Sequence, residues 1–300
     1  MLKFTLKHKR RVRSCVICGA QRDRFIFFGT ENGTMYIVSG NTFTTTPLST
    51  GMIFDLKLHE NYIYTAQQKA VNIYDINTNK EVDFFQDHDN SVKCIDIQTN
   101  ILLSGSRDGS FAMNDVRSHK RIFKEEGTHK TIYDTPSGIT NIKSYNHMII
   151  TAGANGNINV RDNRKNKLLT TFSPSGRGIV DMHVSKHYLM VNSLHSGIYL
   201  YPLSDINMGL YTPSSTVYSE TRRFDNKSYM DDHHIFSTSD SHIQYITPSI
   251  AKKTKINIPN VNCILMNDLN VFLGSDTHIY QYNSCGILYL NQFKKRRIVH

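Results

Sequence analysis

The chain repeats one pattern of hydrophobic and polar positions seven times. In each copy an apolar run enters a tight turn of small or polar residues and continues as a strand with alternating hydrophobic and polar residues. The clearest copies span residues 102–115 and 149–162. The turn recurs near positions 33, 69, 109, 156, 196, 241 and 277. A spacing of about 41 residues is typical of four-stranded propeller blades. The pattern therefore predicts an all-β fold, a closed seven-bladed β-propeller.

A short apolar segment precedes most copies, and we expect it to form the inner strand of each blade beside a central channel. These segments lie near residues 15–18, 53–58, 92–97, 139–142, 179–184, 224–229 and 261–266. No long stretch has helical periodicity. Because the repeats cover nearly the whole chain, we predict a single domain over residues 1–300.

The two ends of the chain are expected to meet in a closed ring. Met1–Leu6 alternates in hydrophobicity and is the candidate outer strand of the last blade, while residues 287–293 compete for the same edge. An antiparallel edge that stays open invites aggregation, and closure removes it. We therefore predict that strands from both ends of the chain share one blade.

The net charge is +10, and much of the excess lies in two basic terminal segments, residues 1–13 and 294–300. In a closed ring these segments would form one basic patch for an acidic partner or nucleic acid, act as a nuclear-import signal, or remain solvated ends. All three interpretations stay open. The basic residues are Lys7, Lys9, Arg10, Arg11, Arg13, Lys294, Lys295, Arg296 and Arg297.

Catalytic and metal-binding patterns are weak in this sequence. Cys15 and Cys18 form a lone C-x-x-C without the second ligand pair that a closed zinc site requires. The acidic and histidine run at 231–234 is better explained as a polar turn. No nucleophile stands with a base, and no phosphate loop is present. We therefore expect no cofactor and no enzymatic activity.

The sequence also bears on the compartment. Five irregularly spaced cysteines argue against a disulfide framework. No apolar run approaches the roughly 20 residues of a membrane span, and the start has no apolar signal-peptide region. These features predict an intracellular, soluble protein.

The third strand of three repeats ends in Tyr74-Asp75, Asn114-Asp115 and Arg161-Asp162, which resembles an eroded form of the Trp-Asp ending of the WD-repeat family. His88 stands where that family has a Gly-His pair. In the family this histidine forms a buried polar network with a strand serine, a turn aspartate and the tryptophan, here Ser104, Asp108 and Asn114. Because Asn114 replaces the tryptophan, the resemblance implies an incomplete network that costs stability.

The order of repeat variants resembles the denticleless family of cullin-4 ubiquitin-ligase substrate receptors over residues 15–285. The segments are 51–58, 64–66, 71–76, 88–95, 104–109, 115–117, 152–166 and 197–201. This resemblance implies that Arg117 and Arg164, two residues after Asp115 and Asp162, dock on an adaptor of the damaged-DNA-binding protein 1 type. It also implies a nuclear protein that recruits replication and cell-cycle substrates, with the sliding clamp on DNA as a further contact. Both copies lack the family's tryptophan before the aspartate.

A second interpretation is a non-catalytic WD-repeat scaffold, for example in ribosome assembly or another RNA-associated complex. The positive charge fits this role equally well, although the sequence lacks a basic groove with interleaved aromatic residues. Residues 118–136 and 204–223 are expected to be long loops available for binding. Adaptor docking gains support if Arg117 and Arg164 lie exposed on one rim beside apolar side chains, and loses it if they are buried in ion pairs.

Overall fold

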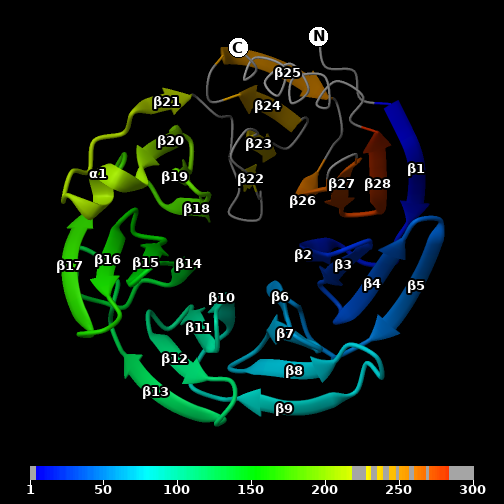
Figure 1. Cartoon of the computed structure of the whole chain (residues 1–300), viewed down its shortest axis with the longest axis horizontal. Helices are drawn as coiled ribbons and strands as arrows, with labels where there is room; N and C mark the ends of the chain where they lie inside the picture. Colours follow the sequence, from blue (N-terminus) through cyan, green and yellow to red (C-terminus); the bar gives the residue numbers. More distant parts are fainter. Residues whose placement is uncertain are drawn as a thin grey trace, which may run out of the picture.

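The computed structural model describes residues 5–217, 228–230, 235–238, 243–247, 250–256, 260–267 and 270–283. Its strands are arranged as small sheets around a central axis (Figure 1). The described residues contain one short helix, α1 (Leu203–Asn207), which follows the third strand of its sheet. The prediction of an all-β chain in a propeller arrangement is confirmed.

Hydrogen bonds join the strands into seven four-stranded antiparallel sheets. Six of these, which we number sheet 1 to sheet 6 in chain order, contain four consecutive strands each. They are β2 (Val16–Arg22), β3 (Phe25–Thr30), β4 (Thr34–Ser39) and β5 (Thr42–Pro47); β6 (Asp55–His59), β7 (Tyr62–Ala66), β8 (Val71–Asp75) and β9 (Glu81–Phe85); β10 (Val92–Gln98), β11 (Ile101–Ser106), β12 (Phe111–Asp115) and β13 (Lys120–Glu125); β14 (Ile139–Tyr145), β15 (Met148–Gly153), β16 (Ile158–Asp162) and β17 (Lys167–Phe172); β18 (Ile179–Val184), β19 (Tyr188–Ser193), β20 (Gly197–Pro202) and β21 (Ser215–Val217); β22 (Ser228–Met230), β23 (Ile235–Thr238), β24 (Ile243–Thr247) and β25 (Ile250–Ile256).

The seventh sheet, which we call the closing sheet, joins the two ends of the chain. Its strands are β1 (Thr5–Arg11), β28 (His278–Asn283), β27 (Asn270–Ser275) and β26 (Val261–Asn267), in that spatial order. β1 pairs with β28 in antiparallel register from Thr5 opposite Asn283 to Arg11 opposite His278. The prediction that strands from both ends share one sheet is confirmed.

The outer strand extends farther along the chain than predicted. Met1–Leu6 is the expected segment because its residues alternate, and residues 1–4 lie outside the described residues. The described strand continues to Arg11 and contains most of the basic residues of the first segment. An outer strand with one face in water gains little from hydrophobic alternation, since backbone pairing and solvated charges suffice there. Residues 287–293 lie outside the described residues.

The innermost strands agree with the sequence pattern. Five predicted segments correspond to β6, β10, β14, β18 and β26, and the segment at 15–18 begins β2. Of the segment at 224–229, the structure describes only residues 228 and 229, which begin β22.

A fully buried apolar residue lies at or just before the start of six described inner strands, between neighbouring sheets. Ile139 and Val16 show the packing: a side chain on Gly105 would clash with Ile139 at 2.7 Å, and one on Gly274 would clash with Val16 at 2.4 Å. Glycine in the second strand of one sheet therefore admits the first inner residue of the next sheet. The residues in this position are Val16, Ile53, Val92, Ile139, Ile179 and Val261.

Candidate functional site

Each sheet has two ends, and they face opposite sides of the ring. In sheet 3, Gln98, Ile101, Asp115 and Lys120 lie at one end, because they pair across the strands in that order. The other end contains the start of β10 and the turn from β11 to β12. Strands of this length place the two ends roughly 20 Å apart. We call the side with the Asp115 turn the rim face and the opposite side the mouth face.

On the rim face, a strand-ending aspartate organises the turn to the outer strand. The Oδ1 atoms of Asp75, Asp115 and Asp162 each accept a hydrogen bond from the backbone N–H two residues later, at 2.8–2.9 Å. The residue four positions after each aspartate has a positive φ of about 50°, as this turn requires. Backbone hydrogen bonds to Arg117 and Ser118 lower the pKa of Asp115. The aspartates therefore have a structural role, and the turn positions that they fix are equivalent in neighbouring sheets.

Arg117 and Arg164 occupy the same position of this turn in sheets 3 and 4, so both lie on the rim face. Their side chains are exposed, at 71% and 62%. Arg164 is held by Asp162 through two bonds, from Nε to Oδ1 at 3.1 Å and from Nη2 to Oδ2 at 2.8 Å. This pairing lowers the pKa of Asp162. Arg117 is held more loosely, with its Nε 3.8 Å from Asp115 Oδ1. Neither arginine is buried.

Exposed apolar side chains lie on the outer strands that begin at these turns. Single exposed apolar residues are common on monomeric proteins, and here they recur on three adjacent outer strands. The residues are Val82 and Phe84 on β9, Ile122 on β13, and Leu168 and Leu169 on β17.

The basic residues near the start of the chain are part of an ordered strand. The Nζ atom of Lys9 lies 5.6 Å from the centroid of the Tyr280 ring. Arg10 lies over Phe43 at 5.1 Å and donates a hydrogen bond to the Asn41 carbonyl at 2.6 Å. Lys7, Arg11 and Arg13 are exposed. The four basic residues of the second terminal segment, Lys294 to Arg297, lie outside the described residues.

The polar network around His88 is buried, as the family resemblance implies, and Asn114 is not bonded into it, since the buried Asn114 Oδ1 has no hydrogen-bond partner among the described residues. His88 Nε2 lies 2.8 Å from Ser104 Oγ, and its Nδ1 lies 2.7 Å from Ser110 Oγ. Ser110 Oγ in turn donates to Asp108 Oδ1 at 2.5 Å. Ser110 thus connects the histidine to the turn aspartate without a tryptophan. Asn114 instead donates to Asp87 at 2.8 Å.

Sheet 4 contains a second buried histidine with part of this arrangement, which the sequence analysis did not identify; the Nδ1 atom of this histidine has no hydrogen-bond partner in the part of the chain that the structure describes. His129 is 1% exposed, and its Nε2 lies 2.9 Å from Oγ1 of Thr151, which occupies in β15 the place of Ser104 in β11. The segment 118–136 was expected to be a long loop. It contains instead the outer strand β13 and this buried histidine. His129 follows Glu125 and Glu126 in a polar stretch, so the hydrophobic pattern contains no sign that it is buried. Only an alignment of this repeat with the one that contains His88 would have revealed it.

Arg161 lies where the WD-repeat resemblance would place a tryptophan in sheet 4, and its guanidinium is buried. Its side chain is 8% exposed and forms an ion pair with Glu125 at the end of β13 in sheet 3. Its Nη1 donates to the Asn166 carbonyl at 2.9 Å, and the guanidinium lies 5.5 Å from the centroid of the Phe111 ring. A planar side chain that bonds across two sheets therefore replaces the planar indole.

We expect stability to fall as the pH decreases from about 6.5 to about 4, with a drop of several degrees in Tm. Burial lowers the pKa of His129 to about 4, whereas a histidine in the unfolded chain titrates near 6.5. In this window the unfolded chain binds more protons than the folded protein does. Acidification therefore favours unfolding, and the stability that comes from keeping His129 neutral is lost. Thermal unfolding across this pH range tests the prediction. His129→Gln should flatten the curve, with a residual slope because burial also lowers the pKa of His88. An unchanged slope would contradict the assignment.

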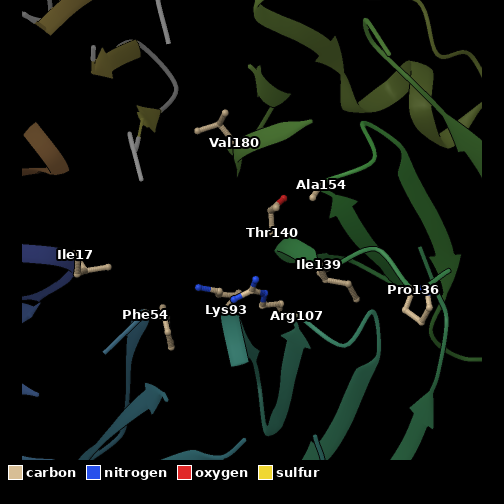
Figure 2. A pocket seen from close by; sticks show the side chains of 10 residues that line it. Ile17, Phe54, Lys93, Arg107, Pro136, Ile139, Thr140, Ala154 and Val180 are labelled. Atoms are coloured by element: carbon tan, nitrogen blue, oxygen red, sulfur yellow. The ribbon is translucent and has the colours of Figure 1, made fainter. Parts of the chain in front are cut away.

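The mouth face contains a pocket of about 470 Å³ at the entrance of the central channel (Figure 2). It is lined by residues from five sheets, including Ile17 of β2, Lys93 of β10, Thr140 of β14 and Val180 of β18. Arg107 reaches it from the turn between β11 and β12. No acidic residue is among the described residues that line it. The sequence analysis missed this pocket because its residues are far apart in the chain.

The cysteine pair lies in a hydrogen-bonded and buried setting. Cys15 Sγ donates to Asp276 Oδ1 at 3.1 Å, and burial raises the pKa of its thiol to about 12. Cys18 is buried and donates to the Ile53 carbonyl at 3.4 Å. Within the described part of the chain, no three histidine, cysteine, aspartate or glutamate side chains are grouped closely enough to hold a metal ion. The described part of the chain also contains no helix with the length and apolar character that crossing a membrane requires.

Comparison with known proteins supports the fold and nothing finer. The chain matches no family model and no curated protein. Among solved structures it is similar to a computationally designed protein, Ika8, with a TM-score of 0.68. The match covers 91% of this chain and 97% of that chain at 13% sequence identity. Such a distant likeness concerns the arrangement of strands only.

Proposed function

We propose that the protein is a non-catalytic propeller of the WD-repeat type, with its seven sheets as seven blades, and that it is a substrate receptor of a cullin-4 type ubiquitin ligase. The observation that supports this most directly is the pair Arg117 and Arg164. Both side chains are exposed, and both occupy the same turn position on one face of neighbouring sheets. One flat partner surface can therefore contact the two guanidinium groups together.

Arginine suits this task because its planar fork makes two parallel charge-assisted bonds to a carboxylate. Arg164 uses Nε and Nη2 for two such bonds to its own Asp162, which holds the side chain in place before any partner binds and leaves Nη1 to donate outward. The exposed apolar side chains on β13 and β17 would supply the non-polar part of the same contact. Under this proposal the adaptor is of the damaged-DNA-binding protein 1 type, and the protein acts in the nucleus on replication and cell-cycle substrates, in some cases beside the sliding clamp.

Arg117→Ala combined with Arg164→Ala is expected to abolish adaptor recovery in a pull-down while leaving the thermal unfolding curve within about one degree of wild type. Losing one partner of a desolvated charge pair costs roughly 2–5 kcal/mol of binding, so each single variant should weaken binding by tenfold or more. The purified adaptor with the purified protein, measured by calorimetry, gives the affinities directly.

Lys80→Ala is the matched control, because Lys80 lies in the equivalent rim-face turn of sheet 2 without the arginine. Wild-type recovery by the double variant would exclude these arginines as the dock. If the wild-type protein recovers no adaptor but co-purifies with RNA-associated proteins, the scaffold interpretation replaces the ligase interpretation.

A further inference from the structure

The residues that line the mouth-face pocket share one structural origin. In β2, β10, β14 and β18, the pairing with the next strand skips the second residue, which is Ile17, Lys93, Thr140 or Val180. A bulge of this kind turns a side chain out of the regular alternation and is common beside binding sites. Here four bulges in four different sheets direct their extra residue to one pocket. Sheets 1, 3, 4 and 5 therefore each supply their bulged residue to a common site, whereas the same bulge in β26 of the closing sheet leaves Asn262 outside the described residues that line the pocket.

The pocket combines apolar and basic side chains. Ile17, Phe54 and Val180 lie apart around it, while Lys93 and Arg107 of sheet 3 provide two positive charges between them (Figure 2). Lys93 Nζ lies 3.7 Å from the centroid of the Phe54 ring, so one of the charges lies directly beside an apolar group. Thr140 adds a hydroxyl beside them.

We infer that this pocket binds a peptide segment in which an anionic side chain, a carboxylate or a phosphate, is next to an apolar side chain. Lys93 and Arg107 would hold the anion, and the apolar group would contact the neighbouring apolar side chains, such as Phe54. A volume of about 470 Å³ is within the range of ligand pockets, roughly 300–1,000 Å³, and suits a few side chains. A nucleic acid fits less well, because the Lys93 ammonium covers a face of the Phe54 ring that a base would need for stacking.

This inference does not depend on the ligase assignment. Lys93 and Arg107 belong to the mouth-face end of sheet 3, whereas Arg117 belongs to its rim-face end. A receptor and a scaffold would both use such a pocket, and the two faces can be occupied at once.

The test uses the full chain and fluorescent nine-residue peptides from a library with one Leu-Glu, Leu-phosphoserine or Leu-Ser pair at the centre. We expect glutamate or phosphoserine peptides to bind by fluorescence anisotropy, with an affinity that decreases as salt increases. The comparison between them identifies which anion the pocket accepts. Peptides with the serine pair should bind at least tenfold more weakly.

Arg107→Gln and Lys93→Gln are each expected to weaken binding about tenfold, and Thr140→Glu, which adds a negative charge without removing a cation, should do the same. Lys93→Arg should retain binding. The Arg117→Ala, Arg164→Ala double variant is the matched control and should bind the peptide like wild type. The proposal would be overturned if anionic peptides bind no better than neutral ones. It would also be overturned if the Arg107→Gln and Thr140→Glu variants bind the anionic peptides as tightly as the wild-type protein does. Tighter binding of a single-stranded oligonucleotide at this pocket would overturn the peptide class.

Discussion

Deleting residues 1–11 should lower Tm by at least roughly 10 °C, the largest loss that we expect from any single change. The deletion removes β1 and leaves β28 as an open edge in the closing sheet. It also uncovers the Tyr280 ring beneath Lys9. An open antiparallel edge is a template for pairing between molecules, so we also expect aggregation on heating. Thermal unfolding followed by circular dichroism and by light scattering measures both effects.

A synthetic peptide with the sequence of residues 1–13 provides the control. Added in excess to the truncated protein, it should restore most of the lost Tm, because an extended peptide can add to an exposed sheet edge through its backbone. A scrambled peptide of the same composition and charge should not. An unchanged Tm after the deletion would show that β1 contributes little to closure.

Arg161→Ala should destabilise the protein by about 3 kcal/mol, because removing one member of a buried ion pair leaves its partner without compensation. In a chain of this size such a loss corresponds to roughly 6–10 °C in Tm. The substitution removes the ion pair with Glu125, the bond to the Asn166 carbonyl and the contact with the Phe111 ring. Chemical denaturation monitored by circular dichroism gives the free-energy difference.

Arg164→Ala is the matched control for this substitution. Arg164 belongs to the same sheet and is also paired with a carboxylate, that of Asp162, but its side chain is exposed. Exposed ion pairs contribute about 0–1 kcal/mol to stability. Glu125→Gln should cost less than Arg161→Ala, since it leaves a neutral partner. Similar losses for Arg161→Ala and Arg164→Ala would mean that burial of Arg161 does not determine its contribution.

The repeat pattern predicted the architecture because each sheet repeats the same physical demands. A buried apolar residue must begin each inner segment, as Ile53 and Ile139 do, and a turn with positive φ must follow the second strand, as at Gly109 and Gly156. These demands determine residue types at fixed spacing, so they are visible in one sequence. The position of Arg117 and Arg164 on one face followed from the same equivalence.

The remaining features depend on contacts between sheets, and no short sequence window contains them. Arg161 is a charged residue that is buried only because Glu125 and Phe111 arrive from the preceding sheet. His129 follows an outer strand of polar composition. The pocket required four bulges, and a bulge changes hydrogen-bond register without changing composition.

The pairing of β1 with β28 also affects how the chain is made. β1 is synthesised before the other described strands, and its partner β28 follows roughly 270 residues later, a delay on the order of 10–50 s at about 5–20 residues per second. During that interval the earlier sheets can form from neighbouring strands, while the basic strand has no edge to pair with. The positive charges of Lys7, Lys9, Arg10 and Arg11 would keep this waiting segment hydrated and repel its copies on adjacent nascent chains. The same residues that look like a tail in the sequence are thus suited to protect the unpaired strand until β28 has been made.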